Sequence, residues 1–415
     1  MNKRRTDSIA ASCAPRTVFR TALWLLALLF CRPALAEISD GEIRVGLLID
    51  LKSTYAHLSG RGSEVAARMA IEELDGKVAG QPIRLVVADH GNNAEQAAEI
   101  ARRWLHDEGI DVIAEVTGSP PALAVQEVNR QRQAVVFYNG VMTSALTGTH
   151  CAPTGIHWMY DGYAFTSVIG RELTRQGATS WYFVVVDNAF GNNVAEDLTR
   201  LVDTSGGRVI GLVHHRFGEE QLFASLRQAA QSGASAIALI NAGNDLIRAV
   251  RQSFDLLTVS KGTTVLAAVA TTINDVHLMK PSLAQGLRLS HSFYWNLDEE
   301  TRAWSKRFFQ IAGTMPNDMQ AGVYSSLTHY FKAVAASRSD HGPTVVKQMR
   351  ELPIRDAIVR NAKLRSDGRM VHDVFLMQVK KPAEIVEPWD YLRVLKTIPG
   401  DQAFKPQAEG GCTSG

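Results

Sequence analysis

The feature that most constrains the fold is an alternation of apolar segments and amphipathic helical segments, which occurs twice along the chain. The first run begins at residues 43–50 (IRVGLLID), a continuous apolar segment typical of a parallel strand covered on both faces. Residues 83–89, 112–115 and 134–138 have the same character, and helical patterns separate them. Repeated strand-helix-strand units with short connections predict a parallel sheet with right-handed crossovers.

A second run of the same kind begins after Cys151, with expected strands at 181–186, 208–213, 236–240 and 264–268. Helices at 299–312 and 323–337 are expected to return to the first half. The turn Ser366-Asp367-Gly368 precedes an expected strand at 370–379. Because no low-complexity linker separates the halves, we expect two hinged lobes. The expected boundaries are 37–157 plus 289–355 for lobe 1, 158–288 plus 356–399 for lobe 2, and 400–415 for a tail.

The first 36 residues have the pattern of a cleavable export signal. A basic region (Lys3, Arg4, Arg5) precedes an apolar region of about ten residues, and Ala34-Leu35-Ala36 matches a cleavage site. The apolar region is too short to span a bilayer, which needs roughly 20 residues. We therefore expect cleavage after Ala36 and a periplasmic mature protein. A short N-terminal anchor is the alternative.

Removal of the signal changes the charge and the cysteine content. It takes away six basic residues and one acidic residue from totals of 44 and 42, which leaves a net charge of −3. A slightly acidic protein lacks the electrostatic footprint of a nucleic-acid-binding protein. Two cysteines survive, Cys151 and Cys412, and in an oxidising compartment they are a natural disulfide pair. Two free thiols are the alternative.

The chain lacks local motifs for catalysis or for cofactor binding. It contains no GxGxxG or GxxxxGK[ST] after a strand, no GxSxG and no HExxH. His214 and His215 are adjacent on an expected strand, so they should face opposite sides and make a poor joint metal site. We expect no cofactor, no metal and no enzymatic activity. A catalytic triad assembled across the lobes would leave no local motif and is the alternative.

Loops after the strands are the expected ligand site, because open parallel sheets bind ligands outside the carboxyl ends of their strands. In the first run these loops offer Tyr55, Thr117, Ser119, Asn139 and Gly140. A helix begins near Ser119, and a helix N-terminus favours an anion such as a carboxylate. Taken singly, each of these residues could equally cap a helix or form a turn. Their shared sheet edge favours a binding site.

Loops of the second run and the crossings between the lobes carry aromatic side chains. Phe190 is an apolar residue in a polar turn, where it either covers the ligand or packs on the next helix. The two expected crossings are rich in aromatic residues, which either pack the hinge or form a stacking wall for a flat ligand. These residues are Trp158, Tyr160, Tyr294 and Trp295.

The order of elements and several segments resemble the type I periplasmic solute-binding proteins of ABC importers, in the branched-chain amino acid receptor group. The resemblance covers essentially the whole mature chain. It rests on the segments IRVGLLIDL, VTGSPPA, NGVMTSALT, VVVDNAFG and AGVYSSLTHY. The segments NLDEETRAWSKRF, GRMVHD and WDYLRVLKTIPGDQAF are similar to a proteobacterial subgroup. The resemblance implies two Rossmann-like lobes with parallel central sheets, joined by a multi-strand hinge, that close on a small molecule for an inner-membrane permease.

The resemblance also implies a set of ligand contacts. Ser119 and the backbone of residues 140–142 should hold a ligand carboxylate, and Phe190 stands at the position of an aromatic lid. Amino-acid receptors of the family usually place an acid near Thr271 and Thr272, whereas here Asp275 is slightly displaced. The complete expected set is Tyr55, Thr117, Ser119, Asn139, Gly140, Val141, Met142, Tyr160, Phe190, Gly243, Thr271 and Thr272.

The missing acid favours a small aromatic or aliphatic carboxylate as ligand, because a buried ammonium without a carboxylate partner is costly. A branched-chain amino acid or an amide is the alternative. A sensor subunit that presents its ligand to a signalling receptor is a further alternative to transport. We expect the protein to act as a monomer, without nucleic acid.

Overall fold

The computed structural model of the protein describes residues 38–53, 55–258 and 264–413, which belong to one compact unit. The expected export signal, residues 1–36, lies outside them. No helix among the described residues is long and apolar enough to cross a membrane. The described residues form two large sheets and one two-stranded sheet.

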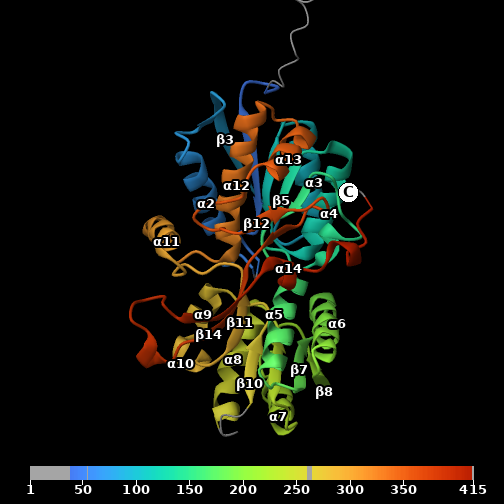
Figure 1. Ribbon diagram of the computed structural model, residues 1–415, viewed down its shortest axis with the longest axis vertical. Helices are drawn as coiled ribbons and strands as arrows, with labels where there is room; N and C mark the ends of the chain where they lie inside the picture. The colour runs from blue at the N-terminus through green and yellow to red at the C-terminus, as the bar shows by residue number, and fades with distance from the viewer. Residues whose placement is uncertain (1–37, 54, 259–263, 414–415) are drawn as a thin grey trace, which may run out of the picture. The chain divides into compact units, whose positions relative to one another are not determined.

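The first sheet has the strand order β2-β3-β1-β4-β5-β6, and all its pairs except β2–β3 are parallel. Helix α12 packs beside α2, and α3 packs beside α4 (Figure 1). We call this sheet with its helices lobe 1. Its strands are β1 (Ile43–Ile49), β2 (Lys77–Val78), β3 (Gln81–Asp89), β4 (Val112–Val116), β5 (Val135–Tyr138) and β6 (Gly155–His157). Its helices are α2 (Gly60–Glu72), α3 (Ala94–His106), α4 (Ser119–Arg132), α11 (Glu299–Ala312), α12 (Asp318–Ser337) and α13 (Gly342–Glu351).

The second sheet, with its helices called lobe 2, has the order β15-β14-β11-β10-β9-β7-β8 and is parallel from β11 to β8. The pairs β11–β14 and β14–β15 are antiparallel. Its strands are β7 (Ser180–Val186), β8 (Arg208–His215), β9 (Ala236–Ile240), β10 (Val265–Ala268), β11 (Arg288–His291), β14 (Val374–Val379) and β15 (Leu392–Ile398). Its helices are α5 (Gly162–Arg175), α6 (Ala189–Thr204), α7 (Phe223–Gln231), α8 (Gly243–Thr258), α9 (Ile273–Met279), α10 (Pro281–Ala284) and α14 (Gly400–Ala403).

The two parallel-dominated sheets confirm the expected fold class, because each strand run became a sheet with helical crossovers. The chain passes between the sheets after β6, after β11, and through the small β12–β13 sheet (Ala362–Leu364 with Met370–His372). The expected single strand 370–379 is two strands, because β13 pairs with β12 whereas β14 pairs with β11. Strand β11 spans the expected boundary at residue 289, and the precise lobe boundaries stay a prediction.

The hinge tryptophans pack within the protein and do not offer an open face. Trp158 and Trp295 are fully buried. The Trp158 indole N–H donates to Ser325 Oγ at 3.0 Å, and that of Trp295 donates to the Trp389 carbonyl at 2.8 Å. The Tyr294 hydroxyl donates to Asp390 Oδ1 at 3.2 Å. Of the two interpretations of this aromatic cluster, hinge packing is therefore correct for these three residues.

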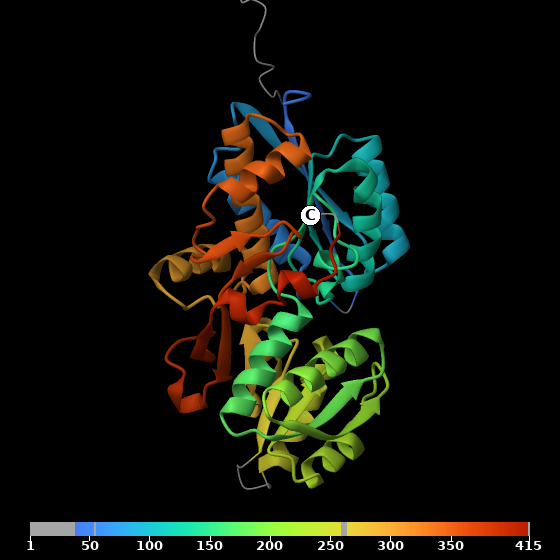
Figure 2. The same cartoon turned by 45° about the vertical axis from the view of Figure 1, so that its right-hand side comes forward.

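The expected disulfide is confirmed, since Cys151 and Cys412 are bonded with their Cα atoms 5.6 Å apart. It ties the C-terminal segment to the loop before β6. Helix α14 of this segment also lies against α5 of lobe 2 (Figure 2). Ser167 Oγ of α5 donates there to the Ala403 carbonyl at 2.6 Å. The C-terminal residues are thus held at several points along their length.

Candidate ligand-binding site

The loop after β4 leads into helix α4, whose first turn has few free backbone N–H groups. Gly118 has φ +87°, and a Cβ there would lie 2.6 Å from Asn92 Oδ1, so this turn requires glycine. Pro120 and Pro121 follow Ser119 in the first turn and have no N–H groups. The helix N-terminus is therefore a weaker anion site than its position suggests. The Ser119 hydroxyl is half-buried and forms no hydrogen bond with a described residue, which leaves it available to a ligand.

The segment after β5 faces the same edge of the first sheet. The carbonyls of Gly140, Val141 and Met142 accept from Gly118, His157 and Gly162, respectively. The N–H groups of Val141 and Met142 form no hydrogen bond with another described residue. The Asn139 side chain is fully buried and lies beside the Glu115 carboxyl.

The loops of lobe 2 contain residues of two kinds. Some cap a helix, and others have polar atoms without a hydrogen-bond partner among the described residues. Thr272 caps α9, because its hydroxyl accepts from Asp275 N at 3.2 Å and donates to Asp275 Oδ2 at 2.8 Å. Thr271 is buried, and its hydroxyl is without a partner among the described residues. Asn241, at the end of β9, binds His215 through Oδ1 and leaves Nδ2 unpaired. Thr271 and Asn241 thus have the buried, open polar atoms that a ligand could satisfy.

Two other residues of lobe 2 lie at helix starts. Phe190 is the second residue of α6 and is half-buried against the hydrophobic core. It follows Asn188, whose side chain accepts from Gly191 N at 2.9 Å and caps the helix. Gly243 has φ +56° and begins α8. Partial burial of Phe190 is compatible with both sequence interpretations, the lid and the packing residue.

The displaced acid, Asp275, is engaged inside the protein. Its Oδ2 accepts from Thr272 N at 2.8 Å, and its Oδ1 lies 3.1 Å from His57 Nε2 of the β1–α2 loop. Asp275 is almost fully buried. Oδ2 thus accepts two hydrogen bonds from Thr272, and Oδ1 is occupied by His57, so Asp275 is engaged by groups of the protein itself.

Two tyrosines lie near the carboxylates of this region. Burial and the charges of Asp245 and Asp50 raise the pKa of Tyr55. Burial raises the pKa of Tyr160 well above its usual value, and Asp318, Glu115 and Asp275 act in the same direction. The Tyr160 ring stacks on Phe165 with centroids 4.4 Å apart, and its hydroxyl forms no hydrogen bond with a described residue. Both tyrosines therefore stay protonated and can donate to a ligand.

Glu115 is the residue of this region that the sequence interpretation missed as a site residue. It is the extra residue where β4 pairs irregularly with β1, and its φ of +61° is rare for a side-chain-bearing residue. It is fully buried, Thr117 donates to its Oε1 at 3.1 Å, and its Oε2 has no partner among the described residues. Strained backbone with a buried, half-paired carboxyl is typical of functional sites. A charged residue ending an otherwise apolar strand was the available signal.

The chemical state of Glu115 follows from its surroundings. Burial raises its pKa to about 8, although the neighbouring Thr117, Asn139 and Gly140 favour the charged form. Gly140 lies against the carboxyl, since a Cβ there would be 3.1 Å from Glu115 Oε1, and its other close neighbour is Met319. Glu115 is therefore neutral at pH 7 and contributes no negative charge to the site.

The chain offers no grouping for a metal within its described ranges, since no three His, Cys, Asp or Glu side chains converge. His214 is exposed and His215 is buried, as expected for neighbours on one strand. An open depression of about 910 Å³ lies between α12 and the segment that follows α13, over Lys332, Leu352 and Arg355, and includes none of the loops described above. Its position makes it a surface feature separate from the candidate site.

Comparison with known proteins identifies the family of this chain. The family model of periplasmic binding proteins matches residues 42–384. The chain belongs to this family. Its solved members of similar sequence include a periplasmic binding protein from Burkholderia mallei, at 36% identity and a TM-score of 0.84, with 90% of this chain and 99% of that chain covered. A comparison with curated proteins gave no match.

A second related structure is a branched-chain amino acid ABC transporter periplasmic ligand-binding protein from Burkholderia xenovorans. It is 32% identical, with a TM-score of 0.85, and the match covers 90% of this chain and all of that chain. A solute-binding protein from Rhodopseudomonas palustris in complex with benzoate shares the fold at 16% identity and a TM-score of 0.76, over 90% of this chain and all of that chain. This periplasmic binding protein therefore has the type I fold of ABC-transporter receptors, which are solute-binding proteins of the periplasm.

Proposed function

We propose that this periplasmic binding protein receives a small carboxylate, aromatic or aliphatic, and delivers it to an inner-membrane ABC permease. The observation that supports the proposal is the state of the three acids around Tyr160. Asp275 and Asp318 are paired inside the protein, and Glu115 is neutral at pH 7. A ligand ammonium would find no unpaired negative charge among these three described acids, and burying it without one would cost free energy.

A ligand carboxylate, in contrast, would meet open donors on both sheets. The Thr271 hydroxyl is buried without a partner among the described residues. The hydroxyls of Ser119 and Tyr160 and the N–H groups of Val141 and Met142 also form no hydrogen bond with a described residue. Donors in a dry site hold an anion best when they are placed before it arrives. Fold relatives crystallised with benzoate and 4-hydroxybenzoate support this ligand class.

The alternative is a branched-chain amino acid or an amide. The Burkholderia xenovorans relative carries the name of a branched-chain amino acid receptor at 32% identity, which favours this alternative. An amino acid would require an acid other than Asp275 to reach its ammonium, and Glu115 would then have to ionise on binding. Affinity for an amino acid should therefore rise with pH towards 8.

We further infer that the mature chain starts at Glu37, behind a signal cleaved after Ala36, and that it acts as a monomer. Ligand binding is expected to favour the state in which the lobes close on it, since a ligand shifts a protein towards the conformation that it binds better. Mass spectrometry of the exported protein would identify its first residue.

The test is a thermal-shift screen of residues 37–415 against amino acids and against aromatic and aliphatic carboxylates. A ligand that binds only the folded state must raise the melting temperature. Hits among the carboxylates alone would support the proposal. Hits among the amino acids alone would overturn it in favour of the alternative.

A further inference from the structure

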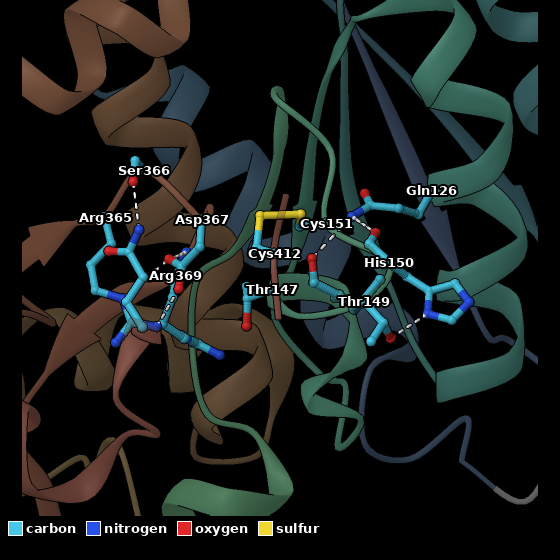
Figure 3. The surroundings of a disulfide bond; sticks show 12 residues. Gln126, Thr147, Thr149, His150, Cys151, Arg365, Ser366, Asp367, Arg369 and Cys412 are labelled. Atoms are coloured by element: carbon cyan, nitrogen blue, oxygen red, sulfur yellow. Dashed lines mark hydrogen bonds and ion pairs between the residues drawn. A yellow bond between two sulfur atoms is a disulfide. The ribbon is translucent and has the colours of Figure 1, made fainter. Parts of the chain in front are cut away.

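A second polar cavity lies away from the ligand loops, beside the disulfide. Its volume is about 170 Å³. Figure 3 shows the disulfide together with Thr147, Thr149, Arg365 and Arg369, which line the cavity. The loop between β5 and β6, the β12–β13 turn and the segment after α14 form its walls. The polar side chains that line it include Ser144, Thr147, Thr149, Arg365, Arg369 and Lys405.

The disulfide holds one wall of this cavity in place. Gly410, two residues before Cys412, lines the cavity and packs so closely on Gly148 that a Cβ there would lie 2.5 Å from the Gly410 carbonyl oxygen. Figure 3 shows Arg365 and Arg369 on one side of the disulfide and Thr149 on the other. The cavity is therefore a built feature with a covalently fixed wall.

Arg369 is the buried cation of this cavity. It is 1% exposed and lies over the Phe404 ring, with its Cζ 4.5 Å from the ring centroid. Its Nε donates to the Met370 carbonyl at 3.1 Å, and its Nη1 reaches Asp161 Oδ2 at 3.4 Å. Its Nη2 has no hydrogen-bond partner in the described chain. An unpaired buried guanidinium nitrogen calls for an acceptor that the protein does not supply.

The other cations leave a positive charge uncompensated. Arg365 is paired with Asp367 and also donates to the Lys405 carbonyl at 2.8 Å. Lys405 is half-buried, and its ammonium forms no ion pair with a described residue. Burial lowers the pKa of Arg369 to about 10, so it stays charged at neutral pH. The charged residues that line the cavity are Arg365, Arg369, Lys405 and Asp161. Asp367 pairs with Arg365, and Asp197, which also acts on Lys405, pairs with Arg200, so one positive charge stays in excess.

We propose that this cavity binds a small oxyanion of the phosphate or sulfate kind, as a site separate from the carboxylate site between the sheets. The anion would give Arg369 Nη2 and the Lys405 ammonium the acceptors they lack, and the threonine hydroxyls could donate to its remaining oxygens. Pockets for drug-sized molecules start at about 300 Å³. A cavity of about 170 Å³ is smaller than that and suits a small ion with a few waters.

The test uses dialysed residues 37–415 with phosphate, sulfate and chloride at matched ionic strength. Phosphate or sulfate should raise the melting temperature in a saturable manner, and chloride should not. Lys405→Gln should weaken the binding at least tenfold by calorimetry. Lys347→Gln, at an exposed lysine of α13, should leave it unchanged.

Two further variants make each outcome decisive. Arg369→Gln should abolish anion binding. If Arg369→Gln does not fold, Lys405→Gln still tests the proposal. Ser119→Ala should leave phosphate binding unchanged, which separates this site from the ligand loops. Absence of a saturable shift, or a shift that Lys405→Gln leaves intact, would overturn the proposal.

Discussion

His57 Nε2 lies 3.1 Å from Asp275 Oδ1, a contact that joins the β1–α2 loop of lobe 1 to helix α9 of lobe 2. Asp275 simultaneously completes the cap of α9 with Thr272. One carboxylate thus stabilises a helix and links the two lobes. This double engagement holds the acid, which stands in the sequence near the expected ammonium position, in contact with groups of the protein.

Loss of the His57 contact should weaken ligand binding. We expect His57→Ala to lower the affinity for the ligand found in the screen by up to about tenfold, the value of about one hydrogen bond, because the closed state loses a link between the lobes. His57→Gln, whose amide can still donate to Asp275, should retain most of the affinity. Calorimetric titration of both variants is the measurement, and equal affinities for all three proteins would contradict the prediction.

Ser119→Ala should weaken binding of the same ligand by about 1–3 kcal/mol, the usual cost of leaving a buried polar partner unmet. The unfolding free energy should change little, because the Ser119 hydroxyl has no partner in the described protein. Ser282→Ala, at an exposed serine of α10, is the control. Unchanged affinity in Ser119→Ala would remove this residue from the site.

The adjacent threonines Thr271 and Thr272 should behave differently. Thr272→Ala removes a helix cap and should lower the unfolding free energy by about 1 kcal/mol. Thr271→Val keeps the shape and removes an unpaired hydroxyl, so it should leave stability unchanged or raised and reduce ligand affinity. Chemical unfolding and calorimetric titration of both variants test this, and the opposite assignment of effects would refute it.

Glu115 should make stability depend on pH. Its folded-state pKa of about 8 lies above the ordinary value of 4.5, so between these values the folded protein binds one proton more than the unfolded chain. Its contribution to the unfolding free energy therefore falls as the pH rises, by about 1.4 kcal/mol per pH unit, and levels off above pH 8. Glu115→Gln should remove this dependence.

Urea unfolding of the wild type and Glu115→Gln at pH 6, 7, 8 and 9 measures the effect. The advantage of the variant should grow from pH 6 to about pH 8 and then stay constant. Glu127→Gln, at an exposed glutamate of α4, should follow the wild type at every pH. A constant difference between wild type and Glu115→Gln would show that Glu115 is charged throughout.

The disulfide should contribute strongly to stability, because it closes a loop across a sequence separation of 261 residues. Cys412→Ser is expected to lower the unfolding free energy by about 2–5 kcal/mol. A reductant should reproduce the effect in the wild type and have none in the variant. A wild type that melts at the same temperature with and without reductant would contradict the prediction.

The sequence by itself determined the two sheets, their parallel character, the disulfide pair and the family. Local patterns carry these features: a continuous apolar strand such as 43–49 requires cover on both faces, and a helix between two such strands makes their pairing parallel. Ligands of open parallel sheets bind outside the carboxyl ends of the strands, and this rule selected the loops after the strands. It placed Ser119 and Asn139 at that edge of the first sheet and Thr271 at that edge of the second.

Only the tertiary structure decided which polar groups remain open. Thr271 and Thr272 are neighbours in sequence, yet one caps a helix and the other keeps an unpaired hydroxyl. Glu115 is a buried neutral carboxyl because the irregular pairing of β4 with β1 turns it inwards. Arg369 contacts Asp161, which is 208 residues away in the sequence. Hydrogen-bond partners and burial depend on long-range packing, and this is why a single sequence predicts where a site lies but not which of its atoms are free.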